Sequence, residues 1–141
     1  MVRNQIPSCR GGQALILVVE RDPHVRALER YFLEQAGFAV EFSADGRMGL
    51  ERARELRPDI VISEILVPGM DGLSVCRALK SDGGLRGVIV LIFSILAAEQ
   101  RAIEAGADGF LRKPLDDALL VASVEALLAG HSRNEGDNAA D

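Results

Sequence analysis

Short apolar runs that alternate with helix-patterned segments limit the possible folds of this sequence more than any other feature. Runs such as Leu15–Val19 and Ile60–Ser63 have the length of a strand and almost no polar face, which is typical of strands buried on both sides. Between them, apolar residues recur at helical spacing, for example from Pro23 to Gly37,. The alternation predicts a parallel sheet with helices on both faces.

One α/β domain is expected over residues 14–129, between a polar, flexible lead over 1–13 and a polar tail over 130–141,. Its strands are predicted at 15–19, 38–43, 60–63, 88–93 and 109–112. Its helices are predicted at 23–37, 46–56, around 73–79, 96–105 and 116–129.

Composition excludes several function classes. The chain has 141 residues with 16 Lys and Arg against 21 Asp and Glu, a net charge of −5, so we expect no nucleic-acid partner. The longest apolar run, Val88–Ala98, is too short to span a membrane,. Two cysteines make no disulfide framework,. A cytoplasmic location is the expectation.

Charged side chains follow the predicted strands where those strands end. The carboxyl ends of parallel strands share one edge of an open sheet, and ligands bind in the crevice at that edge. We therefore expect one site that contains Glu20, Arg21, Asp22, Glu64, Ser94, Lys113 and Pro114. No glycine-rich phosphate loop follows the first strand, which argues against a small flavodoxin-like enzyme.

Five short motifs occur in order over about Ala14–Ala129, and together they resemble the receiver domain of two-component response regulators. The motifs are Ile16–Glu20, Pro58–Ile62, Pro68–Gly72, Gly106–Phe110 and Lys113-Pro114. The resemblance implies a flavodoxin-like (βα)5 fold, with a five-stranded parallel sheet in the order 2-1-3-4-5.

The resemblance also implies a chemistry. Receivers accept a phosphoryl group from a histidine kinase on an aspartate after the third strand. Magnesium lies between that aspartate and two acids after the first strand, and a lysine after the fifth strand contacts the phosphate. Here Glu64 stands at the acceptor position and Arg21 replaces the second acid, while Glu20 and Lys113 match the pattern.

Three further positions follow from the same resemblance. Ser94 is the candidate for the hydroxyl that ends the fourth strand, although it fits there only with a gap, and Phe110 takes the place of the aromatic on the fifth strand. In the family these two residues relay the change to a partner surface. The bond before Pro114 is expected to be cis. Asp22 is either a helix N-cap or a remaining pocket acid.

The two substitutions at the acid positions predict an altered pocket. Glu64 is longer than aspartate by one methylene, ~1.5 Å, and a misplacement of about 1 Å can cost ~10²-fold in rate. Its charge lies nearer the phosphoryl position, where pairing with Lys113 would partly mimic phosphorylation. Arg21 opposes a divalent cation, so magnesium binding is expected to be weak or absent. Arg21 is expected to pair with Glu64 or Glu20.

The last predicted helix is apolar almost all round, which suggests that a partner covers its outer face. A homodimer or a signalling partner is expected at Val121, Val124 and Leu128, or at their neighbours. The sequence therefore favours a pseudo-receiver: a module without enzymatic activity or cofactor, independent of phosphorylation, that acts through protein–protein contacts. The alternative is a working phosphoacceptor receiver, a partner of a histidine kinase, with Glu64 in place of the aspartate.

Overall fold

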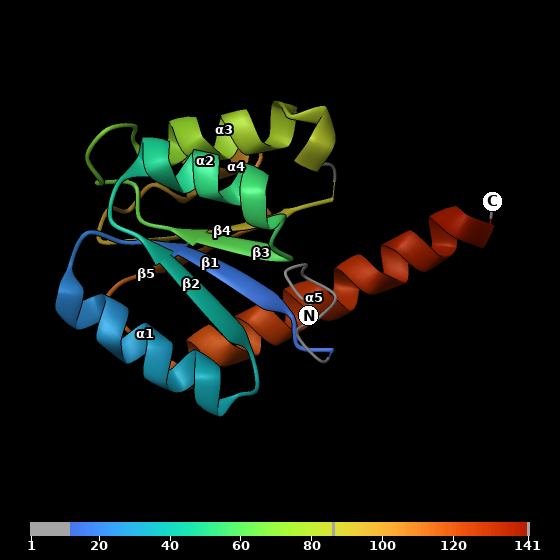
Figure 1. The fold of residues 1–141 in the computed structure, drawn as a ribbon, viewed down its shortest axis with the longest axis horizontal. Coiled ribbons are helices and arrows are strands. Elements are labelled where there is room, and N and C mark those ends of the chain that lie inside the picture. The colour runs from blue at the N-terminus through green and yellow to red at the C-terminus, as the bar shows by residue number, and fades with distance from the viewer. Residues whose placement is uncertain (1–11, 86, 141) are drawn as a thin grey trace.

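The computed structural model describes residues 12–85 and 87–140, with side chains up to residue 131. Its five strands are all parallel and lie in the order β2-β1-β3-β4-β5 (Figure 1), which confirms the predicted fold class and strand order. The strands are β1 Leu15–Val19, β2 Ala39–Ser43, β3 Ile60–Ser63, β4 Ile89–Ser94 and β5 Gly109–Arg112. The helices are α1 Pro23–Gln35, α2 Gly46–Leu56, α3 Gly72–Ser81, α4 Glu99–Glu104 and α5 Asp117–Ala140.

The sheet is the middle of three layers. Helices α1 and α5 cover one face, and α2, α3 and α4 cover the other (Figure 1). Successive residues of β1 serve opposite layers: Ile16 and Val18 face the first, and Leu17 and Val19 the second,. A strand with two buried faces needs an unbroken apolar run, which explains the sequence pattern.

Aspartate side chains cap the N-termini of the first three helices. Asp22 accepts a hydrogen bond from the backbone N–H of His24 at 2.8 Å, and Asp45 and Asp71 cap α2 and α3 in the same way. An N-cap of this kind contributes about 1 kcal/mol. Each cap fixes the point at which the chain leaves the carboxyl edge of the sheet, so these caps shape the loops of the expected site.

Two helices differ from their predicted bounds by more than two residues at one end. Helix α4 begins at Glu99 rather than at residue 96, because Leu96 is held in a turn by a hydrogen bond to the Ser94 hydroxyl. Helix α5 continues through the expected tail to Ala140; Gly130 costs roughly 1 kcal/mol in a helix but does not end one. In the described part of the chain, no helix is both long and apolar enough to cross a membrane. The predicted lead over 1–13 lies, except for its last two residues, outside the described residues.

Gly72 sets how closely α3 approaches the loop after β3. A Cβ at this position would lie 2.2 Å from the carbonyl oxygen of Glu64. We expect Gly72→Ala to lower the free energy of unfolding by about 1–3 kcal/mol, because the loop backbone must move. Urea unfolding measures this change. Gly83→Ala is the control, since a Cβ there meets no atom within 4 Å; equal losses in both variants would contradict the prediction.

Candidate functional site

At the carboxyl edge of the sheet, two buried glutamates form ion pairs with one lysine. Lys113 Nζ lies 2.8 Å from Glu20 Oε1 and 3.1 Å from Glu64 Oε1. The Glu20 and Glu64 side chains are each 2% exposed, and the Lys113 side chain is 15% exposed. The ammonium also lies 5.5 Å from the centre of the Phe93 ring. One cation thus neutralises part of the charge of two carboxylates.

Glu64 is bonded through both carboxylate oxygens. Its Oε2 accepts hydrogen bonds from the backbone N–H groups of Ile65 at 2.6 Å and Leu66 at 3.1 Å, and from the Ser94 hydroxyl. Its Oε1 accepts the N–H of Ile95 at 3.2 Å as well as the lysine. Burial by itself raises the pKa of Glu64, but these hydrogen bonds and the Lys113 charge outweigh it, and the pKa lies below its ordinary value,.

Lys113 is held as a charged group. Burial lowers its pKa, but the hydrogen bonds and the charges of Glu20 and Glu64 outweigh burial and raise the pKa above its ordinary value,. The peptide bond between Lys113 and Pro114 is cis, as the resemblance implies. The pocket therefore contains a charged lysine at neutral pH.

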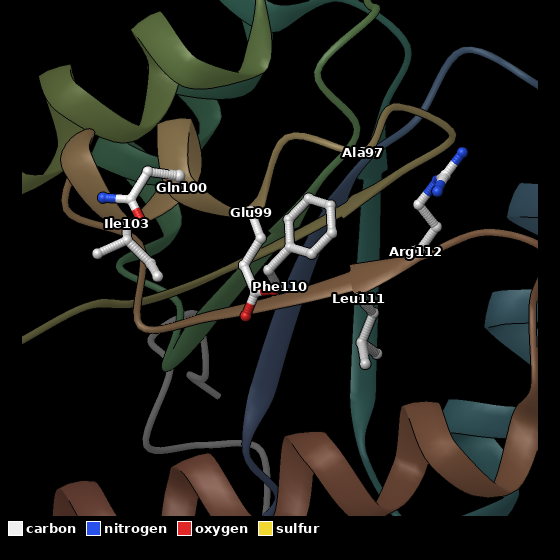
Figure 2. Close-up of a pocket in the computed structure, with 7 residues that line it drawn as sticks. All are labelled: Ala97, Glu99, Gln100, Ile103, Phe110, Leu111 and Arg112. Carbon is white, nitrogen blue, oxygen red and sulfur yellow. The ribbon is translucent and has the colours of Figure 1, made fainter.

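Ser94 ends β4, and Phe110 lies on the neighbouring strand β5. Ser94 is fully buried at the end of β4, and its hydroxyl donates to Glu64. Figure 2 shows the Phe110 ring on the α4 side of β5 and Leu111 on the opposite side, above α5. Phe110 is half-buried and lines a groove between α4 and β5 together with Ala97, Glu99 and Ile103.

The predicted pairing of Arg21 is wrong. Arg21 is exposed, and among the described residues it forms no ion pair with Glu20 or Glu64. The cation that contacts the acids is the half-buried Lys113, whose compact ammonium reaches both carboxylates from the end of β5,. Asp22 is the N-cap of α1; the His24 N–H lowers the pKa of its exposed carboxyl. Its own N–H donates to Glu20 Oε2 at 3.1 Å.

A magnesium ion does not fit these side chains as they stand. Magnesium requires several oxygen ligands in octahedral geometry. The carboxylate oxygens of Glu64 already accept hydrogen bonds from five donors. Those of Glu20 are bound to the Lys113 ammonium and to the N–H of Asp22. Across residues 12–85 and 87–131, whose side chains the structure describes, no group of three His, Cys, Asp or Glu side chains is arranged to hold a metal.

The expected partner surface on α5 also needs correction. Val124 is fully buried, and Val121 and Leu128 pack against the core between α1, α5 and the sheet. Among the described side chains of α5, the large apolar one that is exposed is Leu119, at 52%. The sequence could not separate the two faces of a helix that is apolar almost all round, because its outer face carries alanines such as Ala122 and Ala126.

Two polar residues of α1 were missed by the sequence reading. Arg26 Nη1 donates to the backbone carbonyl of Glu20 at 2.7 Å. Glu29 is fully buried, four residues before Leu33 on the same helix face,. The sequence does contain a signal for Glu29: it lies one helical turn from both Val25 and Leu33, on the face of the helix where an apolar side chain is expected.

Comparison with known proteins agrees with this fold. The response regulator receiver domain family matches residues 16–125. The chain is 36% identical over 135 residues to the transcriptional regulatory protein CseB of Streptomyces coelicolor, covering 92% of this chain and 58% of CseB. It is 37% identical to the DNA-binding response regulator MtrA of Mycolicibacterium smegmatis, covering 88% and 53%. The chain thus spans about half the length of these relatives.

Solved structures show the same architecture. A crystal structure described as a putative response regulator from Chloroflexus aurantiacus has a TM-score of 0.79 and 28% sequence identity, covering 83% of this chain and 98% of that one. The parallel sheet, the pocket at its carboxyl edge and these matches lead to one assignment. This chain belongs to the response regulator receiver domain family of two-component signalling.

Proposed function

We propose that this receiver is a pseudo-receiver, a module without enzymatic activity whose pocket is set by Glu64 rather than by phosphorylation. The contacts of the Glu64 carboxylate carry this proposal. It uses the Ser94 hydroxyl, the Lys113 ammonium and the N–H groups of three loop residues. In the family, the hydroxyl and the lysine at these positions serve a phosphoryl group. A phosphoryl group would have to displace the carboxylate from these donors.

The output of such a module is a protein–protein contact. The groove between α4 and β5, lined by Phe110 and Ile103, and the exposed Leu119 of α5 offer apolar surface for a second copy or another signalling protein,. A histidine kinase is the partner that the family implies. CseB and MtrA are named as transcriptional or DNA-binding regulators; for this acidic chain we propose no direct contact with nucleic acid,.

Backbone amide NMR tests the proposal. Magnesium and then beryllofluoride, a phosphoryl mimic, are added to the 141-residue chain. The amide signals of Glu64, Ile95 and Lys113 are expected to stay in place. The matched control is the double variant Arg21→Asp, Glu64→Asp, which restores the acid pair and the acceptor; its pocket signals are expected to shift.

The opposite result has a definite meaning. Shifts in the unmodified chain that extend from Glu64 to α5 would overturn the proposal. They would identify a working phosphoacceptor receiver with an unusual pocket, the alternative that the family implies. Incubation with acetyl phosphate and intact-mass spectrometry would then show whether the chain accepts a phosphoryl group.

A further inference from the structure

Arg112 ties the end of β5 to the loop between β4 and α4. Its Nε donates a hydrogen bond to the backbone carbonyl of Ile95 at 3.0 Å. Figure 2 shows the Arg112 side chain on the same side of β5 as the Phe110 ring, next to the loop that carries Ala97. A hydrogen bond from a charged donor is stronger than one between neutral groups. The loop is therefore held against the edge strand of the sheet by a side chain.

The same loop residue reaches the pocket through its N–H. The Ile95 N–H donates to Glu64 Oε1 at 3.2 Å. Ile95 is 54% exposed, so burial contributes little to holding it in place. Its backbone is instead held by two polar contacts, with Arg112 on the carbonyl and Glu64 on the N–H. A continuous chain of contacts thus runs from the guanidinium to the buried carboxylate.

Arg112 contributes little to the fold by itself. It is exposed, and among the described residues it forms no ion pair, although Glu99 lines the same groove between α4 and β5. An exposed arginine that donates to a carbonyl usually adds only about 0.5–1.5 kcal/mol to stability. The position of this bond gives it a further consequence, because the carbonyl belongs to the residue whose N–H holds Glu64.

We propose that Arg112 is a positioning residue of the pocket: it holds the Ile95 N–H on Glu64 and links the groove between α4 and β5 to that carboxylate. A change at the guanidinium is passed to Glu64, and a change at Glu64 is passed back to the guanidinium. This path runs through loop backbone and uses neither the Ser94 hydroxyl nor the Phe110 ring, the two positions that the family implies. The inference rests on the proposed function, since it concerns how the Glu64 state is held.

Hydrogen exchange measured by NMR on Arg112→Met tests the link from the groove to the pocket. Methionine keeps an apolar stem and removes the guanidinium. Exchange of the Ile95 amide is expected to be about 2- to 10-fold faster than in the unmodified 141-residue chain,, and the carboxyl-carbon signal of Glu64 is expected to shift. The amides of Ile65 and Leu66, which donate to Glu64 from the other loop, are expected to keep their exchange rates.

Glu64→Asp tests the link in the opposite direction. Its side chain is shorter by one methylene, ~1.5 Å, so the carboxylate is expected to release the Ile95 N–H. The Nε–Hε signal of Arg112 is then expected to shift. The Nε–Hε signal of Arg54, which donates to Asp82 at 3.0 Å far from the pocket in sequence, is expected to stay in place.

Arg101→Met is the matched control. Arg101 is an exposed arginine of α4 that forms no ion pair among the described residues, and its removal is expected to leave the Ile95 amide unchanged. An Ile95 amide that exchanges at the same rate in Arg112→Met and in the unmodified chain would overturn the inference. Equal acceleration at Ile65 and Leu66 would also overturn it, because it would indicate general loosening.

An Arg112 Nε–Hε signal that stays in place in Glu64→Asp would remove the link between the groove and the pocket. All these spectra are recorded without magnesium or beryllofluoride. The beryllofluoride experiment on the unmodified chain tests the pocket state separately, so failure of this inference and failure of the proposed function are distinguishable.

Discussion

Glu29→Leu is expected to be more stable than the unmodified protein, and its advantage is expected to grow by about 4 kcal/mol between pH 5 and pH 8. Burial raises the pKa of Glu29 from 4.5 to about 8 in the native state,. Between these values the native state holds a proton that the unfolded chain has released. The contribution of the Glu29 proton to the free energy of unfolding is therefore fully present below the unfolded pKa of 4.5. It is lost as the pH rises through the native pKa of about 8,.

Urea unfolding followed by circular dichroism, at pH 5, 6, 7 and 8, measures this difference. Circular dichroism is suitable because the chain has no tryptophan. Glu34→Gln is the control, since Glu34 is half-exposed and pairs with Arg30 on the surface; its stability is expected to follow that of the unmodified protein within about 0.5 kcal/mol. Parallel stability curves for Glu29→Leu and the unmodified protein would contradict the prediction.

The fold could be predicted because local pattern and tertiary structure agree. Unbroken runs such as Leu15–Val19 are needed where a strand is covered on both faces, and Asp22-Pro23 signals the start of a helix,. Helix ends were predicted less well. The Ser94 hydroxyl shortens α4 through a contact with Leu96, which helical periodicity does not reveal.

The position of the site was also predictable, because the carboxyl edge collects the residues that follow the strands. Glu20, Glu64, Ser94 and Lys113 meet there. Sequence order could not decide which cation would be buried between the acids. That choice depends on the direction of each side chain: Arg21 is exposed, whereas the Lys113 side chain is 15% exposed and contacts both acids.

Lys113→Met is expected to lower the free energy of unfolding by about 3–5 kcal/mol at pH 7, because it leaves two buried carboxylates without a cation. Methionine retains most of the side-chain volume, so the loss reports the charge rather than a cavity. The control is Arg54→Met, which removes an exposed partner of Asp82 at 3.0 Å; about 0–1 kcal/mol is expected there. Similar losses in the two variants would contradict the prediction.

The pH dependence of the stability of Lys113→Met separates the effect of the lysine charge from the effect of its packing. In the unmodified protein the pKa of Glu64 is lowered, so its contribution to stability is present above the ordinary value of 4.5 and is lost as the pH falls through the native value. Without Lys113, the negative charges of Glu20 and Glu64 repel each other in a buried site, and the native pKa of Glu64 rises. Protonation at pH 4 then relieves the repulsion, so the deficit of Lys113→Met is expected to shrink between pH 7 and pH 4. A deficit that stays constant over this range would show that the lysine acts through packing and not through its charge.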